Sequence, residues 1–138
     1  MSDYASWDEY FMDLCRVISK HSKCKSRKLG AVLVREKAIV ATGFNGPAHG
    51  VGHCGEECPR RTLGYKSGEG LEYCIAAHAE TNCIASAARN GVCTEGCALY
   101  LNWFTPCKDC LSLIINAGIV EVVCTESGFY DTMSRKID

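Results

Sequence analysis

The sequence lacks a strong net charge, a long apolar run, and any internal repeat or low-complexity linker. A formal net charge of -1 at pH 7 argues against a broad, nonspecific contact with a polynucleotide. Residues 111–123 form the most apolar stretch, which is too short and too interrupted to span a bilayer. The acidic first residues contain no apolar run after basic residues, so they predict no secretion signal. We therefore expect a soluble cytoplasmic protein whose partners include neither a membrane nor polymeric nucleic acid.

The length and composition indicate a folded protein of one domain. A chain of 138 residues suits a single domain, residues 1–138, with one moderate hydrophobic core. Hydrophobic residues make up 47% of the sequence and charged residues 22%, which are proportions typical of folded rather than disordered chains.

Cysteine is the residue in excess, with 11 copies. An odd number of cysteines without a secretion signal is not typical of a disulfide framework, whereas neighbouring thiols in a reducing compartment indicate metal binding. Some cysteines need no such role. We expect Cys15, Cys83 and Cys124 to be core residues, because they lie on apolar faces or strands.

The pattern of apolar residues alternates between helices and strands. We expect helices at 6–22, 79–91 and 107–118, a hairpin at 29–44, strands at 97–103 and 119–125, and one short helix at 129–138. Residues 45–74 are rich in Gly, Cys and charge and predict a long functional loop. This order predicts a three-layer α/β sandwich with parallel pairing across the helical connections.

The first predicted helix carries two local signals. Ser6 followed by Glu9 is a capping-box pattern that places the helix start. One apolar stripe follows at spacings of three and four residues. Its members are Trp7, Tyr10, Phe11, Leu14, Val17 and Ile18.

Three residues in the second half of the chain predict a catalytic zinc site. Cys107 and Cys110 lie three residues apart at a helix start, directly after Pro106, so both sulfurs can contact one ion. His78 begins another helix, and two such helix starts over adjacent parallel strands would bring the three ligands together. Three protein ligands leave the fourth zinc position for water. Glu80 lies two residues after His78, where it can transfer protons without binding the metal.

Each part of this pattern is weak when taken alone. A C-x-x-C pair also occurs in redox sites and in structural zinc sites, and a single His is usually structural. The combination of His78, Glu80, Pro106, Cys107 and Cys110 matches the H-x-E…P-C-x-x-C signature of zinc deaminases. The combination therefore favours a deaminase.

With these motifs in place, residues 23–128 resemble the cytidine deaminase superfamily and, within it, the deoxycytidylate (dCMP) deaminases of cells and viruses. The matching segments are "KLGAVLV", "ATGFNGPAHGVGHC", "HAETNCI" and "TPCKDC…INAGIVEVV". "GFNG" is similar to the G-Y-N-G loop of dCMP deaminases, with Phe44 in place of the usual Tyr and without its hydroxyl. The resemblance implies a three-layer α/β/α sandwich with a mixed central sheet of four or five strands. No clear fifth strand follows the last predicted helix.

The resemblance implies hydrolysis of dCMP to dUMP and ammonia, which supplies dUMP for thymidylate synthesis. A water activated by Zn²⁺ attacks C4 of cytosine, while Glu80 protonates N3 and then the leaving amine. By the same resemblance, Asn45 contacts the sugar, the backbone near Ala79 and Thr105 holds the base edge, and Tyr130 also contacts the substrate. Candidates for the phosphate contact are Arg27, Lys28, Arg60, Arg61, Lys66 and Ser67.

The resemblance also implies regulation and assembly. Many members are hexamers that dCTP with Mg²⁺ activates and dTTP inhibits, and the effector acts at the loop formed here by Gly43, Phe44, Asn45 and Gly46. A viral member would act in the host cytoplasm.

A second, structural Zn²⁺ site is a separate hypothesis. Several potential ligands precede the catalytic helix and cluster around the long predicted loop, where a closed four-ligand site would stabilise a segment with little core. The preferred set is Cys24, Cys54, Cys58 and Cys74, with His53 as the substitute. The alternative is a group of free thiols.

Three rival functions stay open from the sequence. Another deaminase of the superfamily, acting on tRNA adenosine or free cytidine, keeps the zinc site, but the acidic balance and the "GFNG" loop argue against tRNA. A non-enzymatic zinc module that binds nucleic acid gives no role to Glu80 and lacks a basic stripe. A single-stranded polynucleotide deaminase needs basic and aromatic residues along an open channel, and aromatic residues make up only 9% here.

Overall fold

The computed structural model describes residues 2–24, 27–47, 78–103, 106 and 108–124. Most of the predicted loop 45–74, the predicted helix 129–138 and any fifth strand lie outside the described residues. Within those residues, no helix combines the length and apolarity needed to cross a membrane.

A mixed four-stranded sheet forms the centre of the described structure. Its strands are β1 (Gly30–Arg35), β2 (Ala38–Phe44), β3 (Ala98–Leu101) and β4 (Glu121–Cys124), in the spatial order β2-β1-β3-β4. β1 pairs antiparallel with both β2 and β3, and β3 pairs parallel with β4. The sequence therefore predicted the hairpin and the parallel pair correctly.

The hairpin between β1 and β2 turns through two residues, Glu36 and Lys37. Both have positive φ angles, 52° and 66°, and they are flanked by the pair Arg35↔Ala38. A two-residue turn with positive φ at both positions matches the right-handed twist of the strands, which explains why the chain reverses here without Gly.

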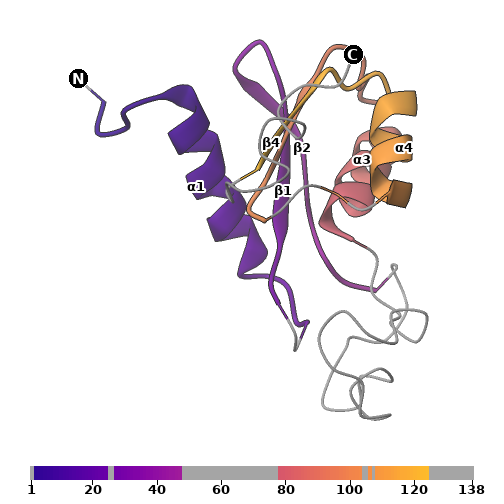
Figure 1. The fold of residues 1–138 in the computed structure, drawn as a ribbon, viewed down its shortest axis with the longest axis horizontal. Helices are drawn as coiled ribbons and strands as arrows, with labels where there is room; N and C mark the ends of the chain where they lie inside the picture. The colour runs from indigo at the N-terminus through magenta and orange to yellow at the C-terminus, as the bar shows by residue number, and fades with distance from the viewer. Residues whose placement is uncertain (1, 25–26, 48–77, 104–105, 107, 125–138) are drawn as a thin grey trace.

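Helices cover both faces of the sheet, as Figure 1 shows. α1 (Trp7–Ser19) lies on one face, while α3 (Ala79–Arg89) and α4 (Lys108–Asn116) lie side by side on the other. The predicted three-layer sandwich is therefore confirmed. The sequence also predicted that the starts of these two helices lie over adjacent parallel strands, and this detail is wrong. The strands that precede α3 and α4 along the chain are β2 and β3, and β1 lies between them.

The start of α1 follows the predicted cap with a small shift. The Ser6 hydroxyl accepts a hydrogen bond from the Glu9 amide at 3.1 Å, while the Glu9 carboxylate accepts one from the Ala5 amide at 3.2 Å. The predicted apolar stripe is wider than the buried face. Trp7 and Val17 are 50% and 53% exposed, because α1 contacts the sheet with only one side.

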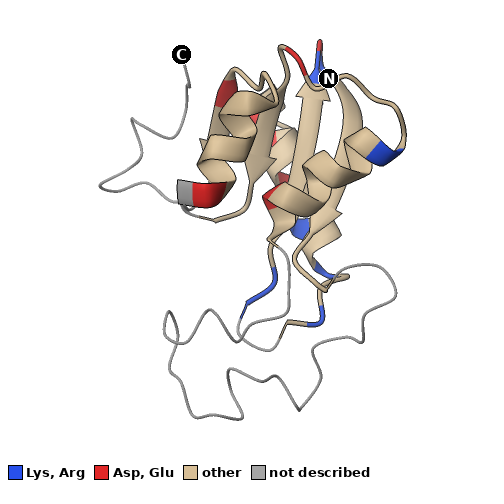
Figure 2. Ribbon diagram, turned by 90° about the vertical axis from the view of Figure 1, so that its right-hand side faces the viewer, with Lys and Arg blue, Asp and Glu red and all other residues tan. Residues whose placement is uncertain are grey.

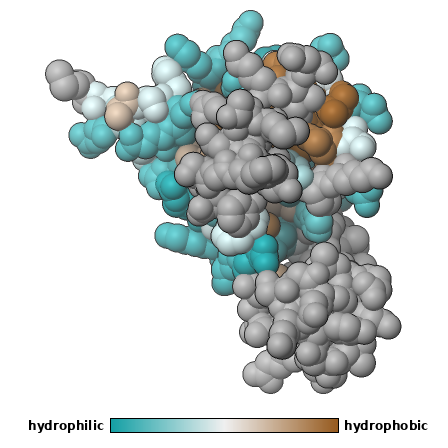
Figure 3. Space-filling view, viewed as in Figure 1, coloured by the Kyte–Doolittle hydropathy of each residue, from teal (hydrophilic) through white to brown (hydrophobic). Residues whose placement is uncertain are grey.

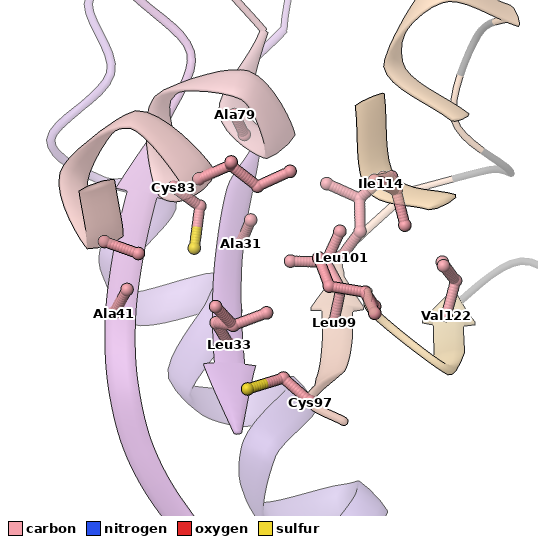
Figure 4. Close-up of a cluster of buried hydrophobic side chains, with 13 residues drawn as sticks. Ala31, Leu33, Ala41, Ala79, Cys83, Cys97, Leu99, Leu101, Ile114 and Val122 are labelled. Carbon is pink, nitrogen blue, oxygen red and sulfur yellow. The ribbon is translucent and has the colours of Figure 1, made fainter. Parts of the chain in front are cut away.

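Two hydrophobic clusters fill the spaces between the layers. The cluster under α3 and α4 joins these helices to the sheet (Figure 4), and its largest fully buried members are Leu33, Leu99, Leu101, Ile114 and Val122. Cys83 belongs to this cluster and Cys15 to the one under α1, and both are fully buried, as predicted. Cys124 is half-buried and packs against the edge of the first cluster. Burial raises the pKa of the Cys15 and Cys83 thiols to about 12.

Charged positions of both signs occur among the described residues (Figure 2). Figure 2 shows basic and acidic positions interspersed on the ribbon, with several basic positions on the segments below the sheet. Figure 3 shows apolar side chains gathered on the side where Figure 1 places α4, and Leu113 and Ile115 of this helix are 38% and 45% exposed.

Candidate metal centre and active site

The starts of α3 and α4 bring His78 and Cys110 together. His78 is the N-cap of α3, and Cys110 lies in the first turn of α4. The His78 Nδ1 atom lies 3.1 Å from the Cys110 Sγ atom. The predicted meeting of two helix starts is therefore confirmed for these two residues. Cys107, the third predicted ligand, lies outside the described residues.

The donor atoms of this group suit zinc. Zinc binds imidazole nitrogen at about 2.0–2.1 Å and thiolate sulfur at about 2.3 Å, so a tetrahedral ion separates the two donors by about 3.5 Å. The observed separation of 3.1 Å is slightly shorter than that value, so a small movement of either side chain would accommodate the ion. Within the described residues, His78, Glu80 and Cys110 form the group whose ligand atoms all lie within 4.8 Å of one another. One ion of the size and chemistry of Zn²⁺ fits between His78 and Cys110.

Glu80 occupies a position suited to proton transfer. Its side chain is only 3% exposed, and it lies in the first turn of α3, two residues after His78. A buried carboxylate is costly unless its surroundings compensate the charge, and the positive end of a helix dipole favours a negative group there. Glu80 is thus held next to His78 and Cys110, and of these three residues His78 is the exposed one.

A close contact with β2 fixes the position of α3. A Cβ atom at Gly43 would lie 2.4 Å from the Cys83 amide nitrogen and 2.8 Å from the Ala79 carbonyl oxygen. No side chain other than hydrogen fits there without moving the helix. Gly43 therefore lets β2 support the first turns of α3, which carry Glu80, and Ala79 is fully buried at this contact.

The turn after β2 is bound to the same helix by a residue that the sequence analysis missed. The Asn82 side-chain amide donates hydrogen bonds to the carbonyl oxygens of Phe44 and Gly46, at 2.8 Å and 3.3 Å. Asn82 lies four residues after His78, so both residues lie on one face of the helix. This spacing is the signal in the sequence that could have pointed to Asn82.

Asn45, the predicted sugar contact, is bound to the segment before β1. Its side-chain amide donates to the Arg27 carbonyl at 3.0 Å, and its side-chain oxygen accepts from the Leu29 amide at 2.9 Å. The Ser22 hydroxyl donates to the Asn45 carbonyl at 2.9 Å. The 7% exposed Asn45 therefore shapes the turn, and its contact with a substrate stays a prediction.

The remaining predicted site residues fall into two groups. Phe44 is 39% exposed and its ring stacks on that of His21, with the centroids 5.6 Å apart. The Arg27 guanidinium lies 4.9 Å from the centre of the Trp103 ring, while Lys28 is exposed. Cys24 is half-buried. The other predicted site residues lie outside the described residues: His53, Cys54, Cys58, Arg60, Arg61, Lys66, Ser67, Cys74, Thr105 and Tyr130.

Comparison with known proteins matches most of the chain to one family. Residues 5–126 match the family model described as the cytidine and deoxycytidylate deaminase zinc-binding region. A deoxycytidylate deaminase of Schizosaccharomyces pombe is 40% identical over 119 residues, which are 86% of this chain but 36% of that protein. The deoxycytidylate deaminase of Mycobacterium phage D29 is 36% identical over 122 residues, which are 85% of this chain and 92% of the phage protein. The chain thus spans less than half the length of the yeast relative and nearly the full length of the phage relative.

A solved structure supports the same assignment. The dCMP deaminase from the cyanophage S-TIM5, in complex with dCMP and dUMP, matches with a TM-score of 0.72 and 27% identity. The match covers 89% of this chain and 83% of the phage chain. The sheet of mixed direction and the helices on both of its faces are thus a fold that this chain shares with the phage structure. The chain belongs to the cytidine and deoxycytidylate deaminase family of zinc-binding proteins.

Proposed function

We propose that this protein catalyses the hydrolytic deamination of dCMP to dUMP and ammonia and so supplies dUMP for thymidylate synthesis. The observation that carries the proposal is the 3.1 Å approach of His78 to Cys110, with the buried Glu80 carboxylate beside both. Relatives named deoxycytidylate deaminase and the phage structure that holds dCMP and dUMP support this choice of substrate.

The proposed zinc ligands are His78, Cys107 and Cys110. Three protein ligands leave a position for water, and bound zinc lowers the pKa of such a water from about 15.7 to about 7. Glu80 is not a ligand in this proposal.

Glu80 carries the protons between water and the base. Its carboxylate takes one proton from the attacking water and delivers it to N3 of the cytosine ring as the new C–O bond forms at C4. It then moves the second proton of that water to the amino group. The C4–N bond breaks, ammonia leaves, and Glu80 is again a carboxylate. Burial beside the reacting atoms keeps bulk water from competing for these protons.

The substrate contacts come from segments around this centre. The backbone at Ala79 and Thr105 holds the base edge, Asn45 contacts the sugar, and Tyr130 contacts the nucleotide. The phosphate is bound by basic residues, and Arg27 and Lys28 are the candidates in the described part of the chain. Arg60, Arg61, Lys66 and Ser67 are the other candidates.

We also propose control by nucleotides. The turn from Gly43 to Gly46 is the effector loop, where dCTP with Mg²⁺ activates and dTTP inhibits a cytoplasmic hexamer. The contact of this turn with α3 through Asn82 supports such a role, since a change in the turn can reach the helix that carries Glu80. Phe44 replaces a tyrosine of the family loop, so any effector contact made by that hydroxyl is absent here.

A second Zn²⁺ is held by Cys24, Cys54, Cys58 and Cys74 in this proposal, with His53 as the substitute ligand. Metal analysis of the pure protein tests it directly. Two zinc ions per chain would support the second site, and a single zinc per chain would contradict it.

The alternative is a different deaminase of the same superfamily, acting on a free nucleoside or on tRNA. Ammonia release tests the choice among nucleotide and nucleoside substrates when it is measured with dCMP, dCTP, CMP and deoxycytidine, each with and without added dCTP and Mg²⁺. Turnover of dCMP that rises with dCTP would support both the substrate and the regulation. Turnover of deoxycytidine alone would contradict the proposed substrate but keep the zinc chemistry.

A further inference from the structure

The Asn82 side chain holds the turn after β2 at two points. Its amide nitrogen donates to the carbonyl of Phe44 at 2.8 Å and to that of Gly46 at 3.3 Å. These two carbonyls flank Asn45. A single side-chain amide therefore binds the backbone on both sides of the residue expected to face the substrate sugar.

The main chain of Asn82 is bonded to the metal-ligand residue. The Asn82 amide donates to the His78 carbonyl at 3.0 Å, which is the first hydrogen bond of α3. Asn82 thus contacts His78 through its backbone and the turn through its side chain. Because the helix backbone is rigid on this scale, the two carbonyls of the turn have a fixed distance from the zinc ligand.

The opposite side of the turn is fixed by other groups. The Asn45 side chain binds the Arg27 carbonyl and the Leu29 amide, and Ser22 binds the Asn45 carbonyl. Those bonds attach the turn to the segment before β1 but not to α3. Within the described residues, Asn82 is thus the side chain that hydrogen-bonds the turn to the helix of the active site.

We propose that Asn82 is a positioning residue that sets the distance between the substrate-binding turn and the zinc site. The proposal rests on the proposed deamination of dCMP, because it assigns Asn82 to the alignment of that substrate. Without the amide, the turn keeps its bonds to the segment before β1 but shifts relative to His78 and Glu80. Substrate binding then weakens more than the chemical step, because the residues that move protons and hold zinc stay in place.

Two variants and one matched control test this role. Asn82→Ala removes the amide, while Asn82→Asp keeps the shape but removes the N–H donor, and a carboxylate near a helix N-terminus does not weaken the helix. Asn90→Ala is the control, because Asn90 also donates its side-chain amide to a backbone carbonyl on α3, that of Ser86 at 2.8 Å, far from the turn. We expect both Asn82 variants to raise KM for dCMP by about tenfold, the size of effect that one or two hydrogen bonds can have. Their kcat and zinc content should stay close to the wild-type values, and Asn90→Ala should leave KM unchanged.

Hydrogen exchange measured on the same proteins does not depend on activity. The amides of residues 43–46 should exchange faster in both Asn82 variants than in the wild type, and those in the centre of α3 should not. Equal KM values in wild type and Asn82→Ala would overturn the proposal, as would a loss of kcat alone. Retention of the wild-type KM by Asn82→Asp would also overturn it, since no donor remains. If the wild type does not act on dCMP, the proposed function is wrong. Hydrogen exchange still tests the positioning role in that case, because equal exchange at residues 43–46 in the wild type and the Asn82 variants would exclude it.

Discussion

The His78 Nδ1 atom and the Cys110 Sγ atom lie 3.1 Å apart although the two residues are 32 positions apart in the chain. The approach results from two helices that lie side by side on one face of the sheet and begin at the same edge. Each helix start contributes one candidate ligand, and the dipoles of both helices favour a thiolate and a carboxylate at this point. The chemistry of the site therefore depends on how α3 and α4 are seated on the sheet.

Glu80→Gln should abolish most turnover without loss of zinc. The amide has the shape of the carboxylate but cannot accept and return a proton, so we expect kcat to fall by about 10²–10⁴-fold. Ammonia release and metal content measured on one preparation check this. Near wild-type turnover would show that Glu80 does not carry the protons.

Cys110→Ala should lose both the metal and the activity, because it removes a ligand rather than a proton carrier. Cys93→Ala is the matched control, since Cys93 is exposed and lies outside the candidate metal group. Zinc is measured in both variants after dialysis against a weak chelator. Full zinc occupancy in Cys110→Ala would contradict its assignment as a ligand.

Gly43→Ala should destabilise the fold and reduce activity together. The new methyl group would overlap the backbone of Cys83 and Ala79, so α3 must move away from β2, at a cost of about 1–3 kcal/mol in the free energy of unfolding. Gly46→Ala is the control in the same turn, because the nearest atom to its added Cβ is a Phe44 ring carbon at 3.9 Å. Urea unfolding curves compare the two. Equal midpoints for both variants would argue against a fixed contact between β2 and α3.

The cysteines should differ sharply in their reaction with an alkylating reagent. Burial raises the pKa of Cys15 and Cys83 to about 12, so neither forms appreciable thiolate near about pH 8, and both are inaccessible. Among the cysteines that the structure describes, the exposed Cys93 should react first. Mass spectrometry of peptides after timed exposure to iodoacetamide gives the order, and early labelling of Cys83 would contradict its burial.

The same pKa shifts set the direction of a pH effect on stability. In the unfolded chain these thiols ionise near their ordinary value of 9.0, while in the folded chain they stay protonated up to about 12. Above the lower value the unfolded state binds fewer protons than the folded state, so the free energy of unfolding falls as the pH rises between these values. Urea midpoints measured across this range should decrease, and constant midpoints would contradict the shifts.

The sequence carries clearer signals for the candidate site than for the contacts around it. The His-x-Glu and Cys-x-x-Cys spacings indicated zinc and a proton carrier because metal ligands need particular side chains. Asn82 gave no comparable signal, since its partners are backbone carbonyls, and every residue has one. The exposure of Trp7 and Val17 was missed for a related reason: helical periodicity shows which residues are apolar but not how much of the helix its neighbours cover.

The central place of β1 has a consequence for synthesis on the ribosome. β1 is buried along almost its whole length and pairs on one side with β2, which follows at once, and on the other with β3, which begins only at Ala98. A nascent chain therefore carries an apolar strand with one open edge while residues 45–97 are still being added, and such an edge can pair with other chains. We expect a fragment that ends before β3 to aggregate or to be degraded. The cell would then accumulate folded protein only from chains whose synthesis has passed that strand.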